Sequence, residues 1–236
     1  MKRQFIWLDN LSIVQRIKLL IVTITTIIVL LSVLNFVSLY NFVYEERLED
    51  TKNVVVIAQH VVQFYYEQEQ LHLMPEETAK STALAVLDSI RYDNNNYVFV
   101  YNYDHVLLAN ATRPDLVGVN RKDAKSPDGV FYVQEGVKAA RAGGGFYSYL
   151  FNAGGASTSS RKIAYALGFD PWQWMIGSGS YIDEIDTFFI HRIIYTILLA
   201  LGSLSLCIYL ISKISVSALH SVNTWLKETF DKVKTK

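Results

Sequence analysis

Two long apolar runs, residues 19–43 and 193–212, bracket the rest of this 236-residue chain. A hydrocarbon core about 30 Å thick is crossed by about 20 helical residues. Neither run contains a charged side chain, each of which would cost about 2.5–3.5 kcal/mol at the centre of a bilayer. We therefore predict two helices that cross a lipid bilayer, residues 19–43 and 189–212, with a domain of residues 44–188 between them.

Basic residues lie at the outer ends of both runs. They are Lys2, Arg3, Arg16, Lys18, Lys213, Lys227, Lys232, Lys234 and Lys236. Because Lys and Arg accumulate on the cytoplasmic side of membranes, we expect residues 1–18 and 213–236 to be cytoplasmic and residues 44–188 to lie outside. Residues 44–188 contain 12 Lys and Arg against 19 Asp and Glu, a net charge near −7, which the basic flanks balance.

A cleaved signal peptide is the alternative interpretation of the first run. The run is longer than the apolar part of a signal peptide, and no cleavage site of small residues follows it. The one cysteine, Cys207, lies in the second run, so the middle segment has neither a disulfide nor a thiol. With about 145 residues that segment can bury a core without one.

The first part of the middle segment has a helical pattern. Apolar residues recur at spacings of three and four from Val54 to Tyr65, which predicts an amphipathic helix that continues directly from the first membrane run. Residues 71–75 interrupt the pattern. Pro75 and the acidic residues after it then predict the start of a second helix, which ends near Arg91.

From Asn94 the period changes to two, which indicates strands. Residues 97–101 and 106–109 predict a hairpin, and residues 130–142 predict a helix that ends at a run of three glycines. Three further strands are predicted over residues 145–151, 162–169 and 173–181, with a loop at 154–160. The predicted fold class is α+β, with a five-stranded antiparallel sheet packed against a long N-terminal helix.

Six short motifs in order resemble one known family. They are residues 97–101 (YVFVY), 116–120 (LVGVN), 127–129 (PDG), 145–149 (GFYSY), 162–165 (KIAY) and 174–183 (WMIGSGSYID). Over residues 44–186 the chain is similar to the single Cache domain of bacterial chemoreceptors and sensor kinases. The resemblance implies a PAS-like, extracytoplasmic domain on the inner membrane of a bacterium that binds small organic ligands, commonly short carboxylates.

Aromatic residues that alternate along the strands are the first candidates for the site, because alternate residues share one face of a sheet. They belong either to the core or to the wall of a ligand pocket. The candidates are Tyr97, Phe99, Tyr101, Tyr147, Tyr149, Phe151 and Tyr165. The resemblance adds Lys162, which it implies points toward the pocket and binds a carboxylate; the alternative is a solvated lysine at a strand end. Asn110 stands where the family usually has His, and it is either a ligand contact or a turn residue. Arg113 either positions the loop over the pocket or is a surface arginine.

The sequence predicts no enzyme and no cofactor. Five histidines are scattered without the spacing of metal ligands, and there is no cysteine pair or phosphate-binding loop. The acidic residues of segment 183–186 are interpreted as a solvated collar beside the membrane.

Residues 213–236 have an apolar stripe and resemble the first helix of a HAMP linker. Three functions remain open: a sensory subunit that signals to a cytoplasmic partner, the sensory part of a longer chemoreceptor or kinase, or a structural protein on a Cache scaffold. The apolar stripes on the long helix and on the tail predict a homodimer. We expect no nucleic-acid partner.

Overall fold

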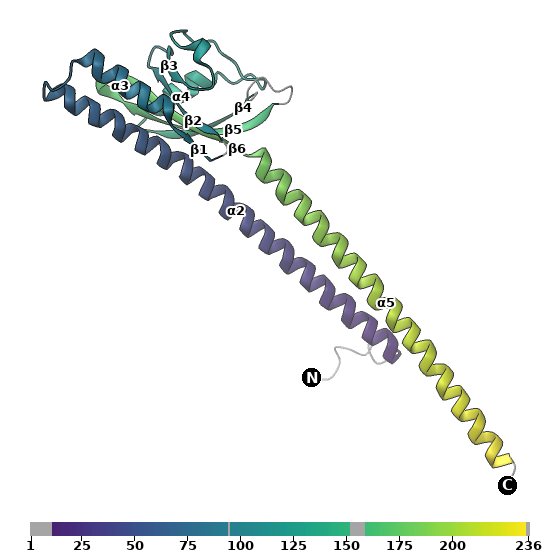
Figure 1. Ribbon diagram of the computed structural model, residues 1–236. Helices are drawn as coiled ribbons and strands as arrows, with labels where there is room; N and C mark the ends of the chain where they lie inside the picture. The colour runs from purple at the N-terminus through teal and green to yellow at the C-terminus, as the bar shows by residue number, and fades with distance from the viewer. Residues whose placement is uncertain (1–10, 94, 152–158, 235–236) are drawn as a thin grey trace, which may run out of the picture. The chain divides into compact units, whose positions relative to one another are not determined.

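The computed structural model describes residues 11–93, 95–151 and 159–234 (Figure 1). The chain divides into two compact units. One is Tyr40–Thr187, and the other is formed by the segments that flank it. Most of the predicted loop at 154–160 lies outside the described residues. The basic residues Lys2 and Arg3 lie outside them as well.

Both flanking segments are helical. Helix α2 runs without interruption over Ile13–Gln70, and α5 over Asp183–Lys234. Both are long and apolar enough to cross a membrane. Large apolar side chains in both helices, such as Leu30 and Leu198, are exposed, as expected for surfaces that face lipid.

The second half of α2 and the helix after it form one layer of the domain. In α2 the buried residues Thr51, Val55, Ala58 and Val62 follow each other at spacings of four and three, so they share one helical face. Helix α3, Glu76–Ser89, begins after Pro75 with two acidic residues in its first turn and buries every fourth side chain. The predicted break between the two helices is confirmed.

The sheet contains the five predicted strands and one short additional strand. Their bounds are β1 Arg91–Tyr92, β2 Asn96–Asn102, β3 Leu107–Asn110, β4 Gly145–Phe151, β5 Ser160–Phe169 and β6 Trp174–Tyr181. The spatial order is β1-β2-β6-β5-β4, with β3 paired to β2, and all pairs are antiparallel. The last strand of the domain, β6, therefore lies at the centre of the sheet.

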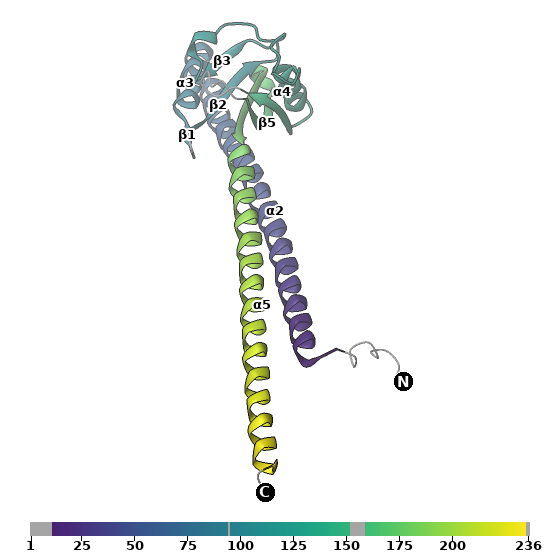
Figure 2. The same cartoon turned by 90° about the vertical axis from the view of Figure 1, so that its right-hand side faces the viewer.

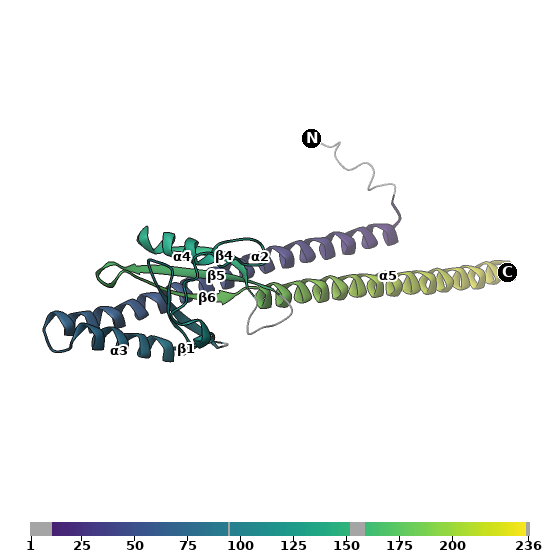
Figure 3. The same cartoon turned by 90° about the horizontal axis from the view of Figure 1, so that it is seen from above.

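Helices cover both faces of this sheet. Helices α3 and α4, the latter Tyr132–Arg141, lie on opposite sides of it (Figures 2 and 3). The alternation along β2 separates two cores: Val98 and Val100 pack with α2 and α3, whereas the aromatic residues Tyr97 and Phe99 pack on the side of α4. The aromatic stripe predicted for β2 thus lies on one face.

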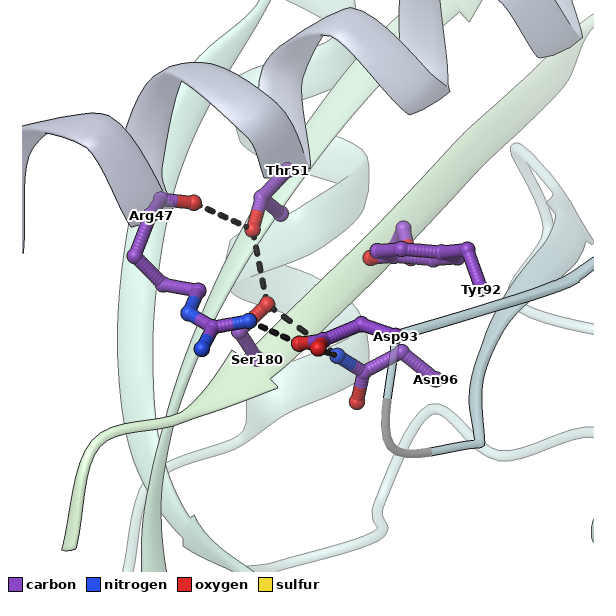
Figure 4. A network of polar contacts seen from close by, with 7 residues as sticks. Arg47, Thr51, Tyr92, Asp93, Asn96 and Ser180 are labelled. Carbon is purple, nitrogen blue, oxygen red and sulfur yellow. Dashed lines mark hydrogen bonds and ion pairs between the residues drawn. The ribbon is translucent and has the colours of Figure 1, made fainter. Parts of the chain in front are cut away.

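A buried polar network fastens α2 to the sheet (Figure 4). The hydroxyl groups of Thr51 on α2 and Ser180 on β6 are 2.9 Å apart, and Nδ2 of Asn96 donates to Ser180 Oγ over 3.4 Å. Arg47, one turn before Thr51, forms an ion pair with Asp93. Because Thr51, Asn96 and Ser180 are polar and buried, their geometry is fixed by their hydrogen bonds as well as by packing, whereas the ion pair lies at the partly exposed edge of the network.

Replacing Thr51 by Ala should destabilise the domain. Thr51 is 1% exposed, and its removal leaves Ser180 without this partner in a buried site, which costs about 1–3 kcal/mol. Chemical denaturation of the full chain in detergent, followed by near-UV circular dichroism, measures the change. The control Thr78→Ala removes an exposed helical threonine and should change the free energy of unfolding by less than about 0.5 kcal/mol. Equal effects of the two variants would contradict a stabilising role for the network.

Candidate ligand-binding site

The face of the sheet that carries α4 encloses a cavity of about 70 Å³. Its walls come from all the strands except β1, from α4 and from the irregular segment between β3 and α4. The lining residues are Tyr97, Phe99, Tyr101, Leu107, Asn110, Arg113, Leu116, Arg121, Tyr132, Val133, Tyr147, Tyr149, Phe151, Lys162 and Met175. At about 10–15 Å³ per water-sized group, the cavity has room for about five to seven such groups.

Eight of the nine residues selected from the sequence line this cavity, and Tyr165 is the exception. Tyr165 packs against the core on the side of α2 and α3, with its ring edge-on to Phe146. Lys162 and Tyr165 are three residues apart on one strand, so their side chains leave opposite faces of the sheet. The placement of Tyr165 in the pocket is corrected for this reason.

Lys162 is the largest fully buried side chain of the domain and is 1% exposed. Its Nζ donates a hydrogen bond to Tyr97 Oη over 3.2 Å and lies 4.4 Å from the centre of the Tyr97 ring. The rings of Phe151, Tyr181 and Phe99 follow at 5.2, 5.3 and 5.7 Å. Among the described residues, no carboxylate lies within 4.0 Å of this ammonium group.

Glycine on the neighbouring strand makes room for the lysine stem. Gly179 of β6 lies beside Lys162, and a Cβ atom at Gly179 would come within 2.7 Å of the Lys162 Cε atom. Two residues earlier, a Cβ at Gly177 would overlap the Phe99 ring. The absence of side chains at these positions lets Lys162 and Phe99 lie across the floor of the cavity.

The electrostatics of the tyrosines differ around the cavity. Burial alone would raise the pKa of Tyr97, but the positive charge of Lys162 and hydrogen bonds with Thr112, Lys162 and Asn110 lower it below its ordinary value. Burial raises the pKa of Tyr101, Tyr147 and Tyr149 instead. The hydroxyl group of Tyr97 is therefore more acidic than those of the other three tyrosines, and a more acidic hydroxyl donates a stronger hydrogen bond to an anion.

Asn110 both lines the cavity and closes a turn. Its Oδ1 accepts the backbone N–H groups of Thr112 and Arg113 over 3.0 and 3.2 Å, and the Thr112 hydroxyl over 2.8 Å. The side chain thereby ends β3 and directs the chain over the cavity. The two roles considered for Asn110 are compatible with each other.

Two lining residues with polar groups, Arg121 and Tyr132, were not among the sequence candidates, and Arg113 was considered only for the loop over the pocket. Arg113 forms a two-pronged ion pair with Asp115 over 2.9 and 2.8 Å. Tyr132, from the first turn of α4, stacks on Tyr149 with ring centres 4.8 Å apart and accepts a hydrogen bond from Arg121 Nη2 over 3.0 Å. Arg113 and Arg121 come from a segment without periodicity, so no strand or helix pattern could indicate their direction.

Known proteins with similar sequences are receptors and kinases. The chain is 29% identical over 187 residues to the methyl-accepting chemotaxis protein McpP of Pseudomonas putida, a match that covers 79% of this chain and 34% of that protein. It is 28% identical to the sensor histidine kinase MctS of Rhizobium johnstonii, with 60% of this chain and 31% of that protein covered. The chain thus spans about a third of the length of these relatives.

A solved structure has the same domain fold. Its title is "Structural basis for carboxylic acid recognition by a Cache chemosensory domain", and it is 31% identical to this chain with a TM-score of 0.57. The match covers 60% of this chain and 97% of that one.

The sequence profile of the family described as Single Cache domain 2 matches residues 43–192, well over half of the chain. This range contains the sheet, the second half of α2, helices α3 and α4, and every residue of the cavity. The chain belongs to the single Cache domain 2 family of sensor domains.

Proposed function

We propose that this protein is a transmembrane sensor whose Cache domain binds a short carboxylate outside the cytoplasmic membrane and transmits the binding event inward. One observation supports the ligand class above all others: Lys162 is buried without a carboxylate partner among the described residues. The domain has a binding role in this proposal and no catalytic one.

The energy of the buried ammonium favours an anionic ligand. Moving a charged group out of water costs several kcal/mol, of which the aromatic rings around Lys162 return about 2 kcal/mol. A carboxylate would offset the remainder through charge-assisted hydrogen bonds from Lys162 Nζ and from Tyr97 Oη. The solved domain whose title names carboxylic acid recognition supports the same class of ligand. The cavity volume of about 70 Å³ limits the ligand to a short acid.

The position of Lys162 also suggests how binding is transmitted. Only Ile182 separates the end of β6 from the start of α5. The backbone N–H of Arg161, next to Lys162, donates to the Asp183 carboxylate in the first turn of α5, and the N–H of Ile182 donates to the Arg161 carbonyl over 3.1 Å. A shift of β5 on ligand binding would therefore move the start of α5 directly.

The flanking sequences support the proposed orientation. Lys and Arg precede the first apolar run and follow the second, which favours cytoplasmic termini and a domain on the periplasmic or outer side of a bacterial inner membrane. The relatives are about three times as long as their matched part, which supports a signalling module or partner in the cytoplasm as the receiver of the signal.

The exposed face of α2 supports a homodimer. Ile57 and Phe64 lie seven residues apart on α2, and Leu71 follows seven residues later, directly after the last residue of the helix; the three residues are 59%, 54% and 66% exposed. Three large apolar residues in one line are typical of a helix that packs against a partner helix. We propose that two copies of the domain meet along this line.

Replacing Lys162 by Met should remove ligand binding and stabilise the ligand-free protein. The apolar side chain has a similar length, and the replacement removes a buried unpaired charge. Thermal unfolding of the full chain in nanodiscs measures both effects. At a hundred times its dissociation constant, propionate should stabilise the wild type by about 2.7 kcal/mol and the variant not at all.

The control for this experiment is Lys138→Met, because Lys138 has a side chain that is 79% exposed. It should change neither the melting temperature without ligand nor the shift with propionate. If Lys162→Met kept the full shift with propionate, the proposed carboxylate site would be wrong.

Single cysteines on α2 should cross-link between copies in a face-dependent way. In a Cys207→Ser background, Ile57→Cys and Phe64→Cys should form disulfide dimers on oxidation in membranes. Lys52→Cys should not, because it lies roughly 140° around the helix from position 57. Non-reducing electrophoresis measures the dimer fraction, and equal fractions at all three positions would argue against this interface.

A further inference from the structure

The charged side chains that line the cavity are all cationic. Three lining residues are cationic, Lys162, Arg113 and Arg121, and none of the lining residues is Asp or Glu. Arg113 is neutralised by its two-pronged pair with Asp115. Among the described residues, neither Lys162 nor Arg121 has a carboxylate partner. Two uncompensated positive charges therefore border one small cavity.

The two charges reach the cavity from different walls. Lys162 is on β5 and lies over the sheet beside Tyr97. Arg121 is in the segment that connects β3 to α4, and its Nη2 donates to Tyr132 at the start of α4. A ligand between the sheet and this segment would meet Lys162 on one side and Arg121 on the other.

The backbone of Arg121 is fixed on both sides. Its N–H donates to the carbonyl of His105 over 2.8 Å, and the neighbouring Asn120 donates from Nδ2 to the Asp104 carbonyl over 2.8 Å. On the other side, Gln134 of α4 donates from Nε2 to the Lys122 carbonyl over 2.8 Å. A donor on such a braced segment is positioned before the ligand arrives, so little entropy is lost on binding.

The guanidinium group of Arg121 has unused hydrogen-bonding capacity. Its Nε is buried and has no hydrogen-bond partner among the described residues, while Nη2 is held by Tyr132. A buried donor without an acceptor is destabilising, because it has lost its hydrogen bonds to water and gained none in the protein. A small turn of the guanidinium toward a ligand oxygen would supply the missing acceptor.

From these observations we infer that Arg121 is a specificity-determining residue: it selects short carboxylates that carry a second oxygen acceptor at the end remote from Lys162. This inference rests on the proposed function, because Lys162 holds the first carboxylate. A ligand that ends in a methyl group would leave Arg121 without an acceptor, whereas a second carboxylate would complete its hydrogen bonds and neutralise its charge.

Isothermal titration of the full chain in nanodiscs tests the inference with matched acids. Malonate and propionate share a three-carbon chain, and succinate and butyrate a four-carbon chain; each pair exchanges a carboxylate for a methyl group. In at least one pair the wild type should bind the diacid about tenfold or more tightly. Arg121→Gln should reduce this ratio to near one while the affinity for the monoacid changes by less than about threefold.

Two further variants separate specificity from structure. Lys122→Gln is the matched control, because it removes the exposed positive charge next to Arg121 from a side chain that does not line the cavity, and it should keep the wild-type ratio. Arg121→Lys keeps the charge and should retain part of the preference, which covers the case in which Arg121→Gln unfolds.

Each remaining outcome is decisive. Equal affinities for diacid and monoacid in the wild type, or an equal loss of both in Arg121→Gln, would overturn the role of Arg121 while leaving the carboxylate site intact. Failure of the wild type to bind any of the four acids would overturn the proposed function, and this inference with it.

Discussion

The ammonium group of Lys162, buried among aromatic rings, is the interaction on which the rest of the domain is organised. Its position requires a glycine on the adjacent strand, a ring of tyrosine and phenylalanine around it, and a tyrosine hydroxyl to accept one of its hydrogens. A group of this kind is costly to bury for stability alone, because an apolar residue of similar size would fill the same space. The proposed binding of an anion gives a reason for this cost, because such a site needs a charge that water does not screen.

The central strand β6 connects this site to the parts of the chain that lie beyond the sheet. On the cavity side, Gly177 and Gly179 allow Phe99 and Lys162 to cross it. On the other side, the hydroxyl group of Ser180 is hydrogen-bonded to that of Thr51 on α2 within the polar network (Figure 4). The strand then leads through one residue into α5. One strand thus contacts the cavity, the N-terminal helix and the C-terminal helix, as the proposed transmembrane sensor requires. A ligand shifts such a structure only by its different affinities for two states.

The periodic parts of the fold were predictable from the sequence, and the irregular parts were not. Alternation along β2 and β4 indicated which aromatic residues share a face, and the glycine and proline signals indicated where helices and strands end.

Strand β1 was missed because two residues are too short to show a period. Tyr165 was added to the candidates as a further tyrosine on the strand next to β4, although it is three positions from Lys162 and so points to the opposite face. Arg121 and Tyr132 were missed because no local sequence pattern indicates that they reach the cavity. Their positions depend on hydrogen bonds that connect the segment between β3 and α4 to the β2–β3 turn and to α4.

The distance between the Lys162 ammonium and a bound carboxylate is the most direct test of this description. Rotational-echo double resonance on the full chain in bilayers can measure it, with ¹⁵N-labelled lysine and propionate labelled with ¹³C at its carboxyl group. The Lys162→Arg variant identifies the lysine signal. A direct ion pair predicts a separation of about 4 Å or less between Nζ and the carboxyl carbon. Bound propionate without measurable coupling to Lys162 would place the ligand elsewhere and contradict the central role of the buried ammonium.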